Sequence, residues 1–164
     1  MKLILPLSVT MPRKTKDDKV FAMNLNNFRN AHHFVMNKAK ILWKEIVKDA
    51  LEKRHVGDTD YRTYYDMPNE PYRFVYTVFP SSGRKFDLGN VLPAIQKFTD
   101  DALVELEEIS DDSWKVIKAI DYRFGGIDKE NPRAELEIFS WEAPRDKEVL
   151  SERADALIGL MRKS

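Results

Sequence analysis

The chain has 164 residues, of which 43% are hydrophobic, 33% are charged and none is cysteine. This length suits a single domain, and the lack of cysteine excludes disulfide bridges, thiolate metal sites and thiol nucleophiles. The apolar stretch at residues 2–7 is too short for a signal-peptide core or a membrane span. We therefore expect a soluble, cytoplasmic protein with no membrane association.

The zero net charge conceals an uneven distribution. Residues 1–57 hold twelve Lys and Arg against five Asp and Glu, a net charge of +7, and the remaining chain carries the opposite net charge. Residues 100–112 hold seven acidic residues and no basic one. A basic front and an acidic centre are typical of a phosphate-binding surface beside a cation site. The alternative is that both are ordinary solvated faces.

In the first third of the chain, residues 2–11 alternate in polarity and predict a strand. A basic loop at 12–19 and a short strand at 20–25 follow. Asn26 or Asn27 is the expected N-cap of the longest helix, in which apolar residues recur every three or four positions to about residue 54. The large aromatic residues of this region are expected in the core rather than in base stacking: Phe21, Phe28, Phe34 and Trp43.

Residues 55–71 are expected to form a loop, residues 72–79 a strand and residues 80–84 a turn. A second amphipathic helix begins after Asp87, with Pro93 in its first turn, where a missing N–H costs little. Two further strands are expected at 114–124 and 134–141, and the loop between them is compatible with a hairpin. After Pro144, a final amphipathic helix is predicted.

These elements predict an α+β fold: a small mixed, mostly antiparallel sheet with two core helices and an added C-terminal helix. We expect one domain over residues 1–143. Residues 144–164 would form a helix that packs on this domain or extends it.

Acidic residues stand where strands and helices meet. Asp87 lies between a predicted strand and the second helix, and Asp111 and Asp112 precede the next strand. Asp100 or Asp101 on the intervening helix supplies a further carboxylate. Mg²⁺ and Mn²⁺ are held in proteins by oxygen ligands such as these. The alternative is that Asp87 caps the helix and that the Asp pair decorates a turn.

Polar and basic residues gather around the start of the long helix, where helix N–H groups and cationic side chains can hold phosphate. His32 and His33 do not predict a metal site, because adjacent helical residues point about 100° apart. The alternative reading is an N-cap with a solvated basic face. The residues concerned are Arg13, Lys14, Lys16, Asn24, Asn26, Asn27, Arg29, His32 and Lys38.

Several motifs, taken in order, resemble the RusA-type endonucleases, the phage-associated Holliday-junction resolvases. The resemblance extends from about residue 3 to residue 141 and rests on the order and spacing of the pieces. They are PRKTK at 12–16, NLNNFRNAHH at 24–33, RKFDLGN at 84–90, KFTDDALVE at 97–105, SDD at 110–112, DYRFGG at 121–126 and PRAELEI at 132–138.

The resemblance implies a homodimeric endonuclease that resolves branched DNA in phage or prophage recombination and replication, with Mg²⁺ as cofactor and Mn²⁺ as the alternative. By position, it makes Asp87 and Asp112 the catalytic residues. The implied metal ligands are Asp87, Asp101, Asp111 and Asp112. To the basic residues of the first helix region it adds Arg84, Lys85, Asn90 and Lys97 as DNA contacts.

One departure from the family pattern bears on activity. The usual motif is Asp-x-Asp-Asn, and Gly89 occupies the position of its second Asp. The family's early-helix Lys is replaced by Pro93, and Lys97 follows about one turn later, so Lys97 and Asp101 are expected to share a face. One alternative to an active nuclease follows from Gly89: a RusA-like protein that binds DNA or a protein partner without cutting. A second, which does not depend on the motif, is an unrelated α+β interaction module with no nucleic-acid role.

Overall fold

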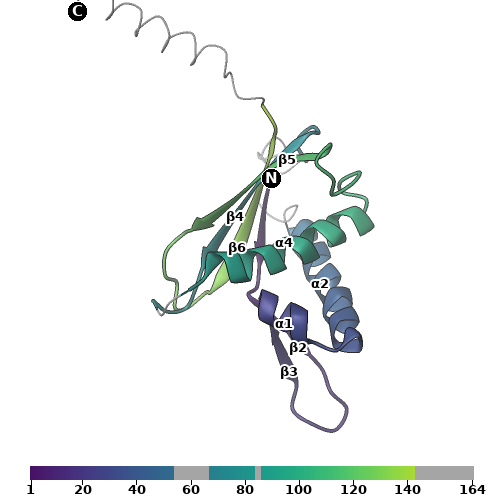
Figure 1. Cartoon of the computed structure of the whole chain (residues 1–164), viewed down its shortest axis with the longest axis vertical. Helices are drawn as coiled ribbons and strands as arrows, with labels where there is room; N and C mark the ends of the chain where they lie inside the picture. The colour runs from purple at the N-terminus through teal and green to yellow at the C-terminus, as the bar shows by residue number, and fades with distance from the viewer. Residues whose placement is uncertain (54–66, 84–85, 143–164) are drawn as a thin grey trace, which may run out of the picture.

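The computed structural model describes residues 1–53, 67–83 and 86–142 (Figure 1). Within these ranges, three strands come first, two helices follow, and a strand, a helix and two further strands complete the fold. In order they are β1 (Lys2–Leu5), β2 (Ser8–Met11), β3 (Lys19–Ala22), α1 (Leu25–Asn30), α2 (His33–Lys53), β4 (Tyr72–Phe79), α4 (Leu88–Glu105), β5 (Ile117–Phe124) and β6 (Arg133–Ser140).

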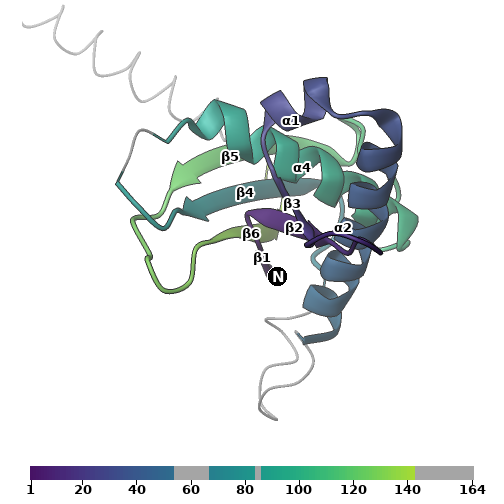
Figure 2. The same ribbon diagram turned by 90° about the horizontal axis from the view of Figure 1, so that it is seen from below.

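The main sheet has the strand order β1-β6-β4-β5. Strand β4 is parallel to β5, and the other two neighbouring pairs are antiparallel. Strands β2 and β3 form a separate antiparallel hairpin. Helices α2 and α4 lie on the same side of the main sheet (Figures 1 and 2). The predicted α+β class with a mixed, mostly antiparallel sheet is confirmed.

The strand predicted over residues 2–11 is two strands in two different sheets. Strand β1 ends at Leu5 and β2 begins at Ser8, with Pro6 between them. Because proline has no N–H, it cannot donate to a continuing ladder. Leu7 instead accepts a 2.9 Å hydrogen bond from the backbone of Met23, which ties the start of the β2–β3 hairpin to the segment that follows it.

The long helix expected to start at Asn26 or Asn27 is also divided. Asn24 is the N-cap of α1, and its side chain accepts a hydrogen bond from the Asn27 N–H at 2.9 Å. Helix α1 ends after one and a half turns at Ala31, whose backbone is extended, and α2 starts at His33. The predicted N-cap was therefore two or three residues late, because the capping amide of Asn24 outcompetes its neighbours for the first turn.

In the second half, β4, α4 and β6 are confirmed. Strand β5 begins at Ile117 rather than 114, and Trp114 lies outside it with its side chain exposed. The expected hairpin between β5 and β6 is wrong, because β4 lies between these strands. Their connection passes the end of β4, where the Gly125 N–H bonds to Val78 and the Asp128 N–H bonds to Pro80, each at 2.9 Å.

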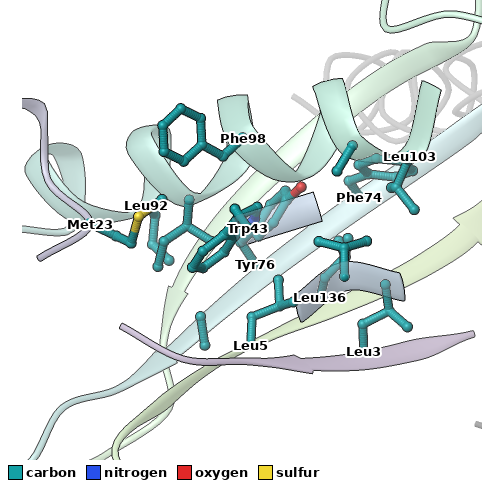
Figure 3. Packing of buried hydrophobic residues seen from close by; sticks show 14 of the residues in the cluster. Leu3, Leu5, Met23, Trp43, Phe74, Tyr76, Leu92, Phe98, Leu103 and Leu136 are labelled. Atoms are coloured by element: carbon teal, nitrogen blue, oxygen red, sulfur yellow. The ribbon is translucent and has the colours of Figure 1, made fainter. Parts of the chain in front are cut away.

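The core lies between the sheet and the two long helices (Figure 3). Trp43 of α2 is fully buried, and its indole N–H donates to the Thr99 hydroxyl of α4 at 3.1 Å. Phe98 of α4 packs against Phe28 with ring centroids 4.6 Å apart. The prediction of a core position is confirmed for Trp43 and Phe21, and wrong for Phe34, which is 71% exposed.

The predicted C-terminal helix at 144–164 lies outside the described residues. No helix in the described part of the chain is both long enough and apolar enough to cross a membrane.

Candidate functional site on helix α4

Three charged side chains that the sequence singled out meet on one side of α4. The Lys97 ammonium lies 2.7 Å from Asp101 Oδ1 and 3.4 Å from Asp112 Oδ2. Lys97 and Asp101 are one helical turn apart, and Asp112 reaches them from the loop that leads to β5. The expectation that Lys97 and Asp101 share a face is met. We call these three residues the Lys97 cluster.

Some basic residues of the first part of the chain form ion pairs with acidic residues of the central part. Lys40 of α2 pairs with Asp101 at 3.0 Å, and Lys44 of α2 pairs with Glu105 at 2.9 Å. The basic side of α2 therefore lies against the acidic side of α4. Such partly exposed pairs contribute little to stability, but they fix which surfaces face each other.

Asp100, which the sequence offered only as an alternative to Asp101 for a further carboxylate, is buried next to the Lys97 cluster. Its side chain is 3% exposed, accepts the Tyr76 hydroxyl at 2.8 Å and accepts the Gln96 amide at 2.9 Å. The Tyr122 hydroxyl from β5 donates to the other end of the same amide, at Gln96 Oε1. The signal was present in the sequence: Tyr76 and Tyr122 occupy inward positions of two strands, where a hydroxyl requires a partner.

Burial raises the pKa of Asp100 from 3.8 to about 6; the hydrogen bonds from Gln96 and Tyr76 oppose the rise, and the negative charge of Asp112 adds to it. Burial also raises the pKa of Tyr76 far above its ordinary value, assisted by the nearby Asp100 charge. Asp101 behaves differently: burial raises its pKa, but the hydrogen bonds from Lys97 and Lys40 outweigh that effect and lower it. The pKa values of the adjacent carboxyls of Asp100 and Asp101 are thus shifted in opposite directions. Such shifts often mark functional sites.

Asp87 is placed apart from this cluster. It is the exposed N-cap residue of α4, and its side chain makes no capping hydrogen bond. Asp87 stands ten positions before Lys97, which is roughly 15 Å along the helix axis. An added Cβ on Gly89 would meet only Asp87 Oδ1, at 3.4 Å, so the missing motif aspartate has room at this position.

The carboxylates expected to hold a metal ion are only partly assembled. Asp101 and Asp112 converge on one cation position, but the Lys97 ammonium stands there. Asp111 is exposed and accepts the Asp112 N–H at 2.9 Å, as a turn residue does. In the described ranges, no three acidic or histidine side chains come close enough to share an ion. Two carboxylates fit Mg²⁺, which takes one or two with water and phosphate, whereas the four implied ligands do not come together in the described residues.

The predicted DNA-binding residues divide into two groups. Asn24 and Asn27 have structural roles: Asn24 caps α1, and the Asn27 amide donates to the Ala22 carbonyl at 2.7 Å. The basic residues are exposed on the hairpin loop and along α1 and α2: Arg13, Lys14, Lys16, Arg29 and Lys38. Asn90 is half-buried in the first turn of α4, and Arg84 and Lys85 lie outside the described residues.

The face of the main sheet that points away from α2 and α4 carries a hollow of about 740 Å³. Alternate residues of β4, β5 and β6 line it, among them Arg73, Asp121, Arg123 and Phe139. Arg73 Nε donates to Asp121 Oδ2 at 2.8 Å across the parallel strand pair. This hollow cannot be read from the sequence, because it depends on which strands are neighbours.

No family model matches the chain, and no curated protein matches it either.

Proposed function

We propose that this protein binds branched DNA and nicks it in a reaction that depends on a divalent metal ion, as the resemblance to the RusA-type endonucleases implies. The observation that carries the proposal is the Lys97 cluster. The resemblance assigns Lys97, Asp101 and Asp112, and the Lys97 ammonium contacts both carboxylates although Asp112 comes from a separate loop. A buried carboxyl with a raised pKa, Asp100, lies directly beside them.

The residues of the chain have distinct roles in this proposal. The Lys97 ammonium is placed to meet a phosphodiester oxygen, and the two carboxylates hold it in position. Asp101 and Asp112 are the side chains that would hold a metal ion once phosphate had drawn Lys97 away. A bound Mg²⁺ supplies charge neutralisation at the phosphate and a water with a lowered pKa. The exposed basic residues of the hairpin loop would hold the DNA backbone.

A second candidate is DNA binding without cleavage. Two observations favour it: Lys97 already neutralises the Asp101 and Asp112 carboxylates, and Gly89 leaves Asp87 without a neighbouring carboxylate. In this candidate the fold and the basic surface are retained, and the protein marks branched DNA or presents it to a partner.

The test is a combined gel-shift and cleavage assay on a synthetic four-way junction, with linear duplex as competitor and with Mg²⁺, Mn²⁺ or EDTA. The nuclease proposal expects metal-dependent nicking of the junction that Asp112→Asn and Asp101→Asn abolish. Asp49→Asn, an exposed acid on α2, is the matched control and should nick like the wild type. Asp87→Asn reports whether the helix N-terminus takes part.

Each outcome assigns a different function. Junction-selective binding without nicking would establish the second candidate, and Gly89→Asp would then test whether restoring the motif aspartate restores cleavage. Binding that falls steeply with salt identifies phosphate contacts, because each neutralised phosphate releases counterions. A wild-type protein without preference for any DNA would overturn both candidates. Light scattering on the same samples tests the homodimer that the resemblance implies.

A further inference from the structure

Three aromatic rings in a row form an exposed surface at the start of α2. The ring centroids of His33 and Phe34 are 4.1 Å apart, those of His32 and His33 are 4.2 Å apart, and those of His32 and Phe34 are 5.2 Å apart. All three side chains are exposed, and Phe34 is 71% exposed. We call this surface the aromatic platform.

The exposure of Phe34 follows from the phase of α2. The buried positions of this helix are Ala39, Trp43, Val47 and Leu51, at four-residue spacing. The same four-residue spacing makes position 35 the core-facing position in the turn before Ala39. Phe34 precedes that position by one residue and therefore points about 100° away from the core side. An isolated exposed apolar side chain is ordinary. A run of three exposed rings in mutual contact is different, because the outer ring faces of such a cluster offer aromatic surface to a ligand.

The rings are held in place by the backbone. His32 caps α2: its carbonyl accepts the N–H groups of Val35 and Met36 at 2.9 and 3.1 Å. Its ring Nδ1 also accepts the Phe34 N–H at 3.4 Å, which couples the His32 ring to the first turn. The platform is therefore built on a hydrogen-bonded helix start, which sets the positions of its three residues on the backbone.

Basic residues border the platform on one side. Lys38, one turn after Phe34 on the same side of α2, donates to the Pro12 carbonyl at the start of the hairpin loop. The loop is ordered by Arg13, whose Nε donates to the Asp17 carbonyl at 2.8 Å. Figures 1 and 2 show this loop and the first turn of α2 at the same end of the molecule. Lys14 and Lys16 of the loop are exposed.

We propose that the aromatic platform stacks an unpaired nucleobase, while the adjacent basic loop holds the phosphates of the same strand. Aromatic rings beside a basic track are how proteins bind single-stranded nucleic acid. Paired bases within a duplex do not offer their faces to such a ring. This inference rests on the proposed function and deepens it, because it specifies an unpaired strand at a branch as the feature recognised.

The test compares binding of a single-stranded oligonucleotide, a linear duplex, and four-way junctions with and without an unpaired base at the branch point. The unpaired base is 2-aminopurine, whose fluorescence is quenched on stacking. Phe34→Ala should weaken binding to the single strand about tenfold to a hundredfold and remove the quenching, since each stacked base contributes that much. Phe34→Ala should change the affinity for linear duplex by less than about twofold, because paired bases do not stack on the platform.

Three further variants separate stacking from other causes. Phe34→Trp keeps an aromatic ring and should retain tight binding and quenching. Ile41→Ala removes an apolar side chain two turns along the same side of α2, which is 62% exposed, and should leave binding unchanged. Lys14→Ala with Lys16→Ala should weaken binding to single strand and duplex together and make the salt dependence shallower. Phe34→Ala should melt at the wild-type temperature, because its side chain is exposed.

Failure of this inference can be told apart from failure of the proposed function. If the wild type binds junctions and Phe34→Ala binds unpaired DNA equally well, the platform is not a stacking site and the proposed function stands. If Ile41→Ala weakens binding as much as Phe34→Ala, general apolar contact explains the effect and the stacking inference is overturned. A wild type that binds no nucleic acid overturns the proposed function itself.

Discussion

The Tyr76 hydroxyl donates a 2.8 Å hydrogen bond to the buried carboxyl of Asp100, and this contact joins the central strand of the sheet to the middle of α4. Gln96 and Tyr122 complete the network, which spans α4, β4 and β5. In the described residues, no buried side-chain nitrogen or oxygen lacks a partner. The protonation state of Asp100 is therefore coupled to how α4, β4 and β5 pack together.

The first prediction concerns pH. The pKa of Asp100 is raised from 3.8 to about 6, mainly by burial, so the folded protein keeps this proton at a pH where the unfolded chain has lost it. The contribution of Asp100 to unfolding free energy therefore falls as pH rises from about 4 to about 6, by on the order of 3 kcal/mol, and then levels off. Asp100→Asn should abolish this change.

The Asn variant can keep the network. Its Oδ1 accepts from Tyr76, and rotation of the Gln96 amide gives its NH₂ an acceptor. The measurement is urea unfolding in EDTA across the pH range, comparing the wild type with Asp100→Asn. Glu135→Gln is the control of opposite sign: burial raises the pKa of Glu135, but Lys2 and Arg133 outweigh it and lower the pKa, so its stabilisation is lost as pH falls. A constant difference between wild type and Asp100→Asn would contradict the prediction.

The second prediction concerns the buried hydrogen bond between α2 and α4. Thr99→Val keeps the volume of the side chain and removes the acceptor of the Trp43 indole N–H, which donates at 3.1 Å. An indole N–H left without a partner in the core costs about 1–3 kcal/mol. Trp43→Phe should lower the unfolding free energy because it leaves a cavity. In the Trp43→Phe variant, adding Thr99→Val should cost much less, because no indole N–H remains to lose its acceptor. Denaturant unfolding of the two single variants and the double variant measures the coupling.

The third prediction compares two glycines. A Cβ on Gly125 would lie 2.3 Å from the Phe79 ring and 2.7 Å from Thr77 Cγ2, and the Phe79 ring is itself packed under Arg133. Gly125→Ala should therefore lower the unfolding free energy by about 1–3 kcal/mol, the usual cost of overpacking. Gly89→Ala, in the first turn of α4, is the matched control and should be neutral or slightly stabilising. Equal melting temperatures for the two variants would refute the steric argument.

The fourth prediction concerns the end of α4. Glu107 has a positive φ of 59°, and the Glu108 N–H bonds back to the Leu103 carbonyl at 2.9 Å, as in a left-handed helix cap. A side chain is strained in this conformation, so Glu107→Gly should stabilise the protein by about 0.5–1 kcal/mol. Glu107→Ala removes the same charge but keeps the Cβ, and no comparable gain is expected. Thermal unfolding of both variants distinguishes backbone strain from charge.

The cluster on α4 could be predicted in part. The four-residue spacing of Lys97 and Asp101 places them on one face of any helix, and this was foreseen from the sequence. That Asp112 joins them depends on the path of the loop after α4, whereas Asp87 is kept apart by the length of α4 between it and Lys97. The burial of Asp100 was not predicted, because Tyr76, which donates to it, and Tyr122, which donates to Gln96, lie far away in the sequence.

The sequence by itself determined the element types and the α+β class, because hydrophobic periodicity and β-forming residues act locally. Only the tertiary structure decided which strands are neighbours: β4 separates β5 from β6, although those two follow each other in the chain. It also decided that Phe34 is exposed, because α2 turns the series Ala39, Trp43, Val47 and Leu51 toward the core and Phe34 lies on another side of the helix. Strand pairing and helix phase depend on contacts between distant segments, which local patterns do not encode.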